Sequence, residues 1–472
     1  MHDIGGGPDQ PAPAAQKISE LGYRVGQDNL GRANYIKTPI AALLAATVLS
    51  GCMGEDIVSR AGNLLGTDEA MATGAPQSSA ALEGELSNGE RSELIDALLN
   101  RRSVISSGPY AQVSSSVLAA NSRAAEAELR AAMLRSEARE MNWLPTLGPT
   151  ISLNSLGSIV TNLVVEQTLF DNGAKRSERE FARADVEVAA VALAQDTNDR
   201  VYQALDLYLS VQASEARAAV NEGGMARMER FEYVMSERVN AGINDRADLQ
   251  LVQQKLTQMR SDVLEDREAA SSARAELAAM SATSLDGVSG IEAISDPAGT
   301  AQPLDVMKVE AEGTRELAEA RALQAGYSPN VSATGILGQG GGAGIDVGIP
   351  NGLGFGRRAD LAAIEAVGQA AELEVAEQRE DSAREVAAIQ GQITSLRRQQ
   401  TNIQTIIAQA NDNYTLFEEQ LRAGQRTVPE VVGVFRTKLD AERDAVALRY
   451  DLARQELKLA RIYGTLVDGE DI

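Results

Sequence analysis

Histidine and cysteine are almost absent from this sequence of 472 residues, which holds one of each, His2 and Cys52. A Ser-His-Asp or Cys-His catalytic arrangement needs such side chains in the folded body, and zinc sites draw on several of them. Two isolated residues near the start of the chain provide neither. We therefore expect no catalytic residue, no metal site and no enzymatic activity, although carboxylate chemistry is not excluded by this absence.

Basic and aromatic residues are also scarce. The chain has 44 Lys and Arg against 67 Asp and Glu, a formal net charge of −23. This balance argues against nucleic acid as a partner, because binding to phosphate backbones requires a basic surface. Aromatic residues make up 4% of the chain, whereas hydrophobic residues make up 44% and charged residues 24%. Such a composition, rich in alanine, leucine, glutamate and arginine, favours long helices in a folded protein.

The single cysteine follows a short apolar run. Lys37 precedes the run Ile40–Leu49, and the small residues Ser50 and Gly51 lead to Cys52. A basic residue, a short apolar run and small residues at a cleavage site are typical of a secretory signal, and the run is too short to span a bilayer as a helix. The Leu-Ser-Gly-Cys motif resembles the lipobox of bacterial lipoproteins. The resemblance implies that residues 1–51 form a signal region and that Cys52 becomes a lipidated N-terminus.

The segment after the cysteine predicts a flexible, lipidated tether over residues 52–90. Glycine, alanine, serine and acidic residues dominate it, a composition that does not build a packed core. Met53 and Gly54 stand where an aspartate often retains lipoproteins at the inner membrane. Their identity favours the outer membrane.

Beyond the tether the chain repeats itself with a period of roughly 183 residues, far longer than the periods of solenoid proteins. Residues 91–282 form the first repeat and residues 304–466 the second, with a linker at 283–303 and a tail at 467–472. Four motifs recur in the same order: Trp143-Leu144-Pro145 as Tyr327-Ser328-Pro329, Phe170-Asp171-Asn172-Gly173 as Gly354-Phe355-Gly356, Ala241-Gly242 as Ala423-Gly424, and Lys255-Leu256 as Lys438-Leu439.

Each repeat predicts a helix, a β-hairpin and two further helices. Proline ends the opening helices, expected at about residues 112–141 and 304–325, because the residue before proline avoids helical geometry. Alternation of apolar and polar residues then predicts strand pairs with one apolar and one polar face at residues 145–170 and 329–350.

Two long helices without internal proline are expected next, at residues 174–240 and 357–422. Each is about 100 Å long at 1.5 Å per residue. We expect the first to run unbroken through Gly223 and Gly224. Returning helices follow at residues 245–282 and 429–464, with apolar residues at the three- and four-residue spacing of a coiled-coil seam. The seam residues are Leu249, Val252, Leu256, Met259, Val263, Val428, Val432, Phe435 and Leu439.

The glycine-rich stretch at residues 338–358 has two interpretations. It matches a phosphate-binding loop loosely, but such a loop requires a buried strand before it and a helix directly after it. In the repeat, residues 338–342 instead occupy the place of the first hairpin's turn, and residues 352–356 that of the strand-to-helix corner. Turns and corners of this kind favour glycine, so we interpret the stretch as structural.

This order of elements resembles the TolC family of outer-membrane channel proteins over residues 90–466. The most specific motifs are Leu169-Phe-Asp-Asn-Gly173 at the strand-to-helix corner and the glycine turns at residues 238–243 and 421–426. The resemblance implies a mainly helical fold with a small β part, arranged as two structural repeats. It also implies a trimer in which a twelve-stranded transmembrane β-barrel continues as an α-barrel. Four strands cannot close alone in lipid, where the smallest barrels have about eight strands.

The resemblance further implies an exit duct that crosses the outer membrane and extends into the periplasm. Its partners would be two further copies of the chain, a periplasmic adaptor, an inner-membrane transporter and outer-membrane lipid. Both a tripartite efflux pump and a type I secretion system fit this description. The family needs no cofactor, and the expected lipid anchor is the only attached group.

Five residues take family roles by position. Gly242 and Gly424 would form the periplasmic tips that meet the adaptor. Asp248 would face Arg426 in a charged contact that holds the mouth of the duct closed. Glu430 takes the place of an acidic residue that constricts the entrance.

The sequence departs from the family pattern at two gate positions. Leu421 stands where some members have a tyrosine, and Gly433 where they have a second aspartate. For each charged gate residue the alternative is an ordinary solvated helix surface, where an ion pair contributes under about 1 kcal/mol. For the whole chain, the main alternative is a periplasmic coiled-coil structural lipoprotein without a pore, which would explain the helices and the lipobox but not the two hairpins.

Overall fold

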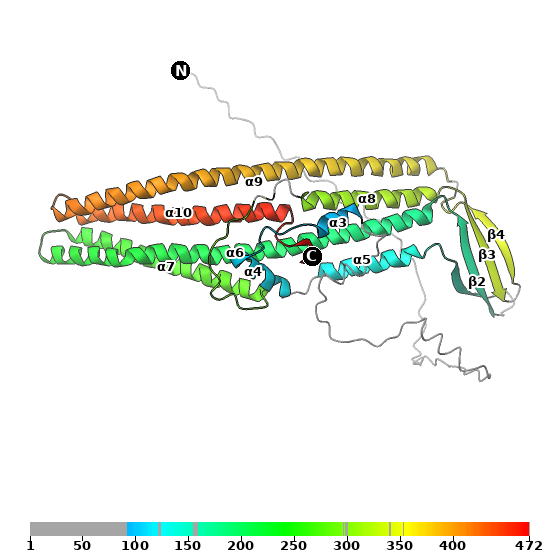
Figure 1. Ribbon diagram of the computed structural model, residues 1–472, viewed down its shortest axis with the longest axis horizontal. Helices are drawn as coiled ribbons and strands as arrows, with labels where there is room; N and C mark the ends of the chain where they lie inside the picture. Colours follow the sequence, from blue (N-terminus) through cyan, green and yellow to red (C-terminus); the bar gives the residue numbers. More distant parts are fainter. Residues whose placement is uncertain are drawn as a thin grey trace, which may run out of the picture. The chain divides into compact units, whose positions relative to one another are not determined.

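The computed structural model describes residues 92–471, except residues 121–123, 154–158, 296, 298–300, 339–340 and 353. The predicted signal region, the tether and Cys52 lie outside the described residues. The described chain is mainly helical with a small antiparallel sheet, as predicted (Figure 1).

Both halves of the chain contain the series helix, two strands, long helix and returning helix, and the first half has two further helices before this series. The first half contains α3 (Glu93–Leu99), α4 (Gly108–Ala119), α5 (Ala124–Glu140), β1 (Thr146–Leu153), β2 (Ile159–Phe170), α6 (Ala174–Asn240) and α7 (Arg246–Met280). The second half contains α8 (Leu304–Ala325), β3 (Asn330–Gly338), β4 (Gly342–Gly348), α9 (Arg357–Arg422), α10 (Val428–Ile462) and the short 3₁₀ helix η1 (Gly469–Asp471).

The prediction of one helix over residues 112–141 is wrong. This segment belongs to two helices, α4 and α5, which end and begin on either side of residues 120–123. Val117 of α4 packs into a cluster with Val201 of α6, whereas Leu129 of α5 packs with Leu193 of α6. Val117 and Leu129 are twelve residues apart, whereas their partners on α6 are only eight residues apart. One continuous straight helix would not keep both contacts, because both helices rise by the same distance per residue.

The helices pack as one layer of four columns. Helix α9 packs against α8 and α10, these two pack against α6, and α6 packs against α5 and α7 (Figure 1). Helix α6 lies inside the layer and buries 23 of its 67 residues. Helix α9 forms one edge and buries only seven of its 66 residues. In the described chain, α9 and the α5/α7 column therefore each have one side without a helical neighbour.

The largest hydrophobic cluster lies in the middle of this layer, and the predicted linker packs onto it. Tyr110 of α4 and Leu205 of α6 are fully buried there. The segment 283–303 was predicted as a linker between the halves. The hydroxyl of Tyr208 donates a hydrogen bond of 2.8 Å to the carbonyl of Gly290 within it. The described residues around Gly290 thus pack onto the core around α6.

The predicted tail at residues 467–472 also begins inside the fold. The backbone N–H of Leu466 donates to Asn198 Oδ1 at 3.0 Å, and Val467 is 2% exposed. Burial of these residues fixes the C-terminal end of α10 against α6.

Helix α6 runs through Gly223 and Gly224 without a break, as expected. The two glycines differ in their surroundings. A Cβ atom on Gly223 would meet nothing within 4 Å, whereas a Cβ atom on Gly224 would lie 2.7 Å from Leu439 Cδ1 and 3.3 Å from Met259 Cε. At Gly224 the side chain of Leu439, from α10, therefore packs directly against the backbone of α6.

Candidate channel surfaces and helical tips

The four strands form one antiparallel sheet in the order β1-β2-β3-β4. Strands β2 and β3 come from different halves of the chain and pair along most of their length, from Asn162 opposite Gly338 to Phe170 opposite Val331. The two predicted hairpins are thereby joined into a single sheet. Strands β1 and β4 are its edges.

The register gives the sheet an apolar face and a polar face. Residues directly opposite each other on paired strands point to the same face, and neighbours along a strand alternate. One face carries Leu147, Pro149, Ile151, Leu163, Val165, Leu337, Ile345 and Val347, together with Thr161 and Gln167. The other carries Thr146, Thr150, Asn162, Glu166, Thr168, Ser332, Thr334 and Asp346, together with Val164 and Ile336.

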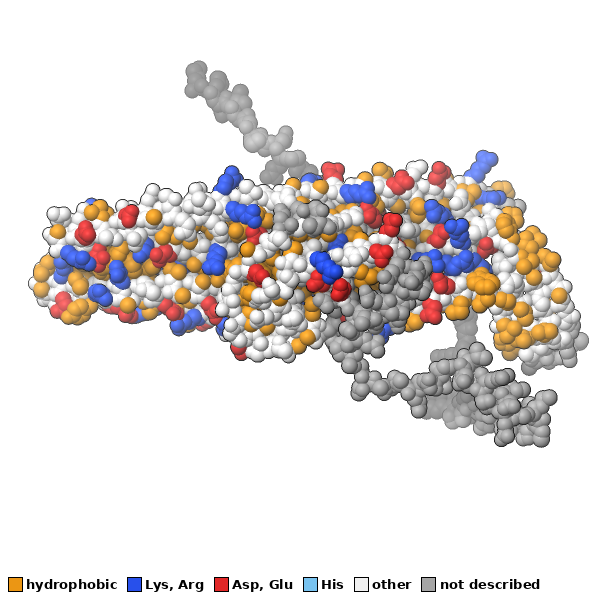
Figure 2. Space-filling model, in the orientation of Figure 1, with side chains coloured by type: hydrophobic (Ala, Val, Ile, Leu, Met, Phe, Trp, Pro, Cys, Tyr) orange, Lys and Arg blue, Asp and Glu red, His pale blue; other side chains and the backbone are white. Residues whose placement is uncertain are grey.

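The apolar face is uncovered. Leu147, Ile151, Ile345 and Val347 are between 65% and 70% exposed, and Figure 2 shows hydrophobic side chains gathered over the strands. On the opposite face, Thr334 Oγ1 donates to Asp346 Oδ2 at 2.7 Å. A sheet with these two faces can separate an apolar medium from water. No helix of the described residues is both long enough and apolar enough to cross a membrane.

The far ends of the long helices close in matching turns. After α6, Gly242 has φ +71°, and the Ile243 N–H donates to the Arg238 carbonyl at 2.8 Å. After α9, Gly424 has φ +72°, and the Gln425 N–H donates to the Gln420 carbonyl at 2.8 Å. Both are Schellman motifs, in which the residue beyond the helix takes the left-handed conformation that glycine adopts without strain. A Cβ atom on either glycine would meet nothing within 4 Å.

The predicted gate residues lie beside these turns. Asp248 is in the first turn of α7 and accepts a hydrogen bond of 3.2 Å from Asn244 Nδ2. Arg426 precedes α10, and its Nη1 atom lies 3.0 Å from Glu430 Oε1. Within the described chain, the contacts of Arg426 thus go to Glu430 rather than to Asp248. A contact between Asp248 and Arg426 would have to form between two copies of the chain.

Two further contacts hold Arg426 in place. Its Nε donates to Gln420 Oε1 at 2.9 Å, and its guanidinium carbon lies 4.4 Å from the centre of the Phe417 ring. Both partners belong to the last turns of α9. The Arg426 side chain therefore contacts residues on both sides of the tip turn, in α9 and in α10.

Glu430 has a local role that the sequence analysis did not include. Its Oε2 atom accepts hydrogen bonds from the Thr427 backbone N–H at 2.8 Å and from the Thr427 hydroxyl at 2.9 Å. The two residues form a capping box at the start of α10. These hydrogen bonds, together with the one from Arg426, lower the pKa of Glu430 below its ordinary value.

The predicted coiled-coil seams meet in one cluster between two helical hairpins, α6 with α7 and α9 with α10. Val252, Met259 and Val428 are fully buried, and Leu256 and Phe435 are 2% and 3% exposed. The two seams therefore join the hairpins to each other as well as closing each hairpin. Their partners on the long helices, which the sequence analysis did not name, are Met228, Phe231, Met235 and Tyr414.

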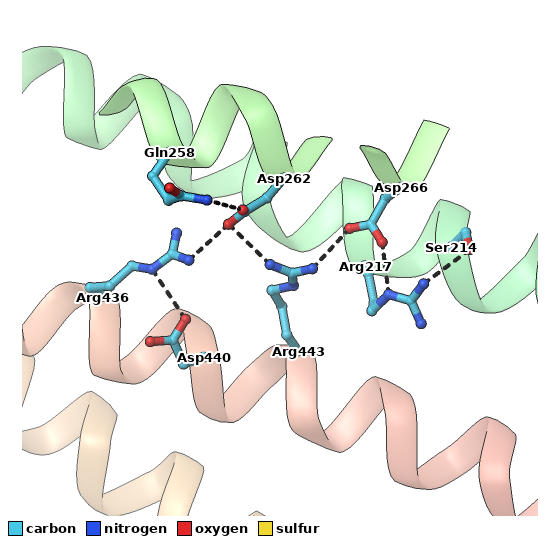
Figure 3. Close-up of polar contacts among 8 residues, drawn as sticks. All are labelled: Ser214, Arg217, Gln258, Asp262, Asp266, Arg436, Asp440 and Arg443. Carbon is cyan, nitrogen blue, oxygen red and sulfur yellow. Dashed lines mark hydrogen bonds and ion pairs between the residues drawn. The ribbon is translucent and has the colours of Figure 1, made fainter. Parts of the chain in front are cut away.

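Next to this cluster, a buried ionic network joins α6, α7 and α10 (Figure 3). Asp262 Oδ2 of α7 lies 2.8 Å from Arg436 Nη2 and 3.1 Å from Arg443 Nη1, both of α10. Asp266 lies 3.0 Å from Arg443 Nη2 and 2.8 Å from Nε of Arg217, on α6. Asp262 and Asp266 are 9% and 4% exposed. We call these five residues the hairpin network.

Sequence reasoning missed the hairpin network, although a signal was present. Asp262 and Asp266 lie one helical turn apart, a spacing at which like charges repel each other in an isolated helix. They also flank the seam residue Val263, and Arg436 stands next to the seam residue Phe435. Like charges bordering an apolar seam indicate partners of opposite charge on the helix that packs there.

No protein-family model matches this sequence, and no curated protein matches it. Solved structures match it by fold. A membrane protein from Pseudomonas aeruginosa superimposes with a TM-score of 0.67 and 16% identity, over 79% of this chain and 93% of that one. The outer-membrane channel OprN gives a TM-score of 0.66 and 15% identity, over 79% and 96%. The outer membrane protein VceC from Vibrio cholerae gives 0.62 and 16%, over 79% and 95%.

At this level of identity the comparisons establish a shared fold. OprN is an outer-membrane channel and VceC an outer membrane protein, and the alignments cover 96% and 95% of these chains. The prediction of a mainly helical fold with a small sheet is thereby confirmed, whereas the twelve-stranded barrel of a trimer stays a prediction.

Proposed function

We infer that this chain, which has the fold of the TolC family of outer-membrane channels, is one subunit of such a channel. Three copies would form an exit duct across the outer membrane and periplasm, in a tripartite efflux pump or a type I secretion system. A periplasmic adaptor and an inner-membrane transporter would complete the machine.

The observation that carries this proposal is that the sheet and the helical layer are open at the same two edges. Each strand connects directly to one helical column: α5 leads into β1, β2 into α6, α8 into β3, and β4 into α9. The lateral orders β1-β2-β3-β4 and α5-α6-α8-α9 therefore coincide. The edge formed by β1 with α5 and α7 can meet the edge formed by β4 with α9 in a second copy. Such a head-to-tail contact closes into a ring when the rotation between copies permits.

The two faces of the sheet fit a barrel wall. In lipid, unpaired strand edges are not tolerated, so four strands must join those of other copies. Three copies supply twelve strands, more than the minimum of about eight. The apolar face would then contact lipid, and the face with Asn162, Glu166 and Asp346 would line a water-filled pore. Helices of 67 and 66 residues would continue the duct by about 100 Å.

Disulfide cross-linking between strand edges tests this assembly. Ile151 on β1 and Ala343, Ile345 or Val347 on β4 share the apolar face, and Cys52 is the only natural cysteine. We expect Ile151→Cys combined with one of the three β4 cysteines to give covalent dimers and trimers, but no larger species, after oxidation in outer membranes. Each variant with only one introduced cysteine is the control and should remain monomeric after heating in detergent.

The alternative, a structural lipoprotein without a pore, predicts a different result. Its strand edges would not meet, so no pair of cysteines would yield a closed trimer, and unheated extracts would lack a large heat-modifiable band. Purified protein would also form no conducting channels in planar bilayers.

We also propose that Cys52 carries the lipid anchor. Cys52→Ser should leave an uncleaved precursor that takes up no labelled fatty acid. Normal processing of this variant would show that the protein is not a lipoprotein, without bearing on the pore.

A further inference from the structure

Aromatic side chains gather where the strands meet the helices. The chain has only 1 Trp, 10 Tyr and 6 Phe, yet one aromatic residue stands at each of the four junctions. Trp143 precedes β1, Phe170 ends β2, Tyr327 precedes β3, and Phe355 follows β4. Trp143 and Phe170 are 60% and 57% exposed, and Phe355 is wholly exposed. Nothing in the described chain covers these three rings.

An irregularity in β2 places one of these rings on the apolar face. Thr168 pairs with Ser332 on the polar face, but the next pair is Phe170 with Val331, because a β-bulge leaves Leu169 unpaired. Without the bulge, Phe170 would follow the alternation and join the polar face. Bulges at the rim of a sheet commonly redirect a side chain in this way.

Cationic side chains lie directly beyond the aromatic residues. Lys175 and Arg176 are in the first turn of α6, and Arg358 is in the first turn of α9. Lys175 Nζ donates to the carbonyl of Asn142 at 2.7 Å, which places this ammonium group beside the backbone next to Trp143. The Arg176 side chain is 79% exposed, and its Nε lies 3.0 Å from Glu180 Oε1. Arg358 is exposed.

These cations keep free donors, whereas the neighbouring carboxylates are engaged. Asp171 accepts from the backbone N–H groups of Gly173 and Lys175 at 3.1 and 2.8 Å, and Asp360 accepts from the Tyr327 hydroxyl at 2.9 Å. A lysine has three N–H donors and an arginine five, and the contacts above use at most one of them on each side chain. Unused N–H donors therefore remain on Lys175, Arg176 and Arg358 at the junctions, in a chain of net charge −23.

We propose that this junction band, formed by Trp143, Phe170, Tyr327, Phe355, Lys175, Arg176 and Arg358, binds the headgroups of anionic phospholipids. The proposal rests on the channel function and names the lipid that the channel selects at the periplasmic boundary of the membrane. Tryptophan and other amphipathic rings prefer the level of the headgroups. Arginine and lysine at that level form charge-assisted hydrogen bonds with lipid phosphates. Without these cations, an anionic membrane surface would repel this acidic protein.

The single tryptophan makes a direct test possible. The full-length protein would be reconstituted into phosphatidylcholine vesicles that contain one fifth phosphatidylglycerol, with either lipid carrying bromine on its acyl chains. Bromine quenches tryptophan fluorescence on contact, so Trp143 reports the lipids beside Lys175. We expect brominated phosphatidylglycerol to be enriched about two- to fivefold over its mole fraction at Trp143, and the enrichment to fall toward one in 1 M NaCl.

Charge-removing variants assign the effect. Lys175→Gln with Arg176→Gln should abolish the enrichment while leaving the quenching by brominated phosphatidylcholine. Arg398→Gln is the matched control, because Arg398 is an exposed cation on α9 far from the sheet, and it should change nothing. The junction at Phe355 is tested in a protein with Trp143→Phe and Phe355→Trp, in which the fluorescence reports the lipids beside Arg358. In this protein Arg358→Gln should abolish the enrichment.

The possible results separate this proposal from the channel function. Equal quenching by both brominated lipids at their mole fractions would overturn the anionic selectivity while leaving the sheet in the membrane. Absence of quenching by either lipid would overturn the membrane position of the sheet, and the channel function with it. Enrichment that persists in the Lys175 and Arg176 variant would overturn the assignment to these cations.

Discussion

At the scale of single residues, two adjacent glycines in α6 allow a matched comparison. Alanine is favoured over glycine inside a helix by about 1 kcal/mol. Gly223→Ala should therefore raise the free energy of unfolding by up to about 1 kcal/mol, since a Cβ atom there meets nothing. Gly224→Ala gains the same propensity but places the Cβ atom 2.7 Å from Leu439 Cδ1. Overpacking of this kind typically costs about 1–3 kcal/mol.

We expect the Gly224→Ala protein to unfold at a lower temperature than the Gly223→Ala protein, measured by circular dichroism on the purified protein. Equal stabilisation by the two changes would show that Leu439 moves aside without cost. The contact between the hairpins would then be looser than the structure indicates.

The hairpin network provides a second prediction at this scale. Asp266→Asn leaves Arg217 without a charged partner and removes one of the two carboxylates beside Arg443. Because the site is buried, we expect a loss of about 2–4 kcal/mol in the free energy of unfolding. Asp440→Asn is the control. Its side chain is 53% exposed although it lies 3.1 Å from Arg436 of the same network, so its loss should stay under about 1 kcal/mol. Similar losses for both variants would contradict the importance of burial.

The same network sets a pH dependence. Burial raises the pKa of Asp262, but hydrogen bonds from Arg436 and Gln258 and the charges of Arg436 and Arg443 outweigh burial, so the pKa is lowered from 3.8. A carboxyl group with a lowered pKa in the folded state stabilises it above the unfolded pKa and stops doing so as pH falls through the folded value. The contribution of Asp262 should therefore be constant near neutral pH and decline progressively as the pH falls below about 4.

Single residues also mark where the sequence was insufficient. The seam residues were predictable because apolar spacing along one helix is a local pattern. The role of Gly224 and the pairing of Asp262 with Arg436 depend on which helix lies opposite, at a separation of about 170 residues or more in the chain. No periodicity within a helix contains that information.

At the scale of elements, local signals placed the ends of the long helices. A glycine with positive φ ends α6 and α9, and a capping box begins α10, so the residues at each boundary are sufficient to form it. The division between α4 and α5 and the packing of residues 283–303 were not predicted. Both depend on the surface that α6 presents, and neither leaves a periodic pattern in its own segment.

The tip turns give a prediction for these elements. Valine is strained by about 1–2 kcal/mol at a left-handed position, whereas asparagine visits this conformation more readily. We propose that the turns contact the adaptor, because a Cβ atom on Gly242 or Gly424 would meet nothing within the chain. Gly242→Val and Gly424→Val should then abolish export while the heat-modifiable trimer persists, and the asparagine variants should retain part of the export. Loss of the trimer itself would mean that these glycines serve folding.

At the scale of the whole molecule, the assembly stays a prediction. The repeat, the two-faced strands and the unbroken long helices form layers with open edges, and copies of the chain could pair along these edges. Which side chains meet across those edges depends on the rotation between copies, and no single chain specifies it. The gate contact between Asp248 and Arg426 belongs to this class and remains a proposal.

The structure sharpens the test of that gate, because Arg426 already has partners within its own chain. We expect Asp248 of one copy to compete with Glu430, Gln420 and the Phe417 ring for the guanidinium group. Arg426→Gln and Asp248→Asn should each raise single-channel conductance in planar bilayers, and the double variant should add little, because both changes remove one contact. Glu430→Gln keeps a side chain that can complete the capping box but weakens the hold on Arg426. It should therefore leave the conductance unchanged or lower it, since the freed arginine bridges to Asp248 more often. If Glu430→Gln instead raises the conductance as much as Arg426→Gln does, the acidic residue itself closes the entrance and the Asp248 contact is not the gate.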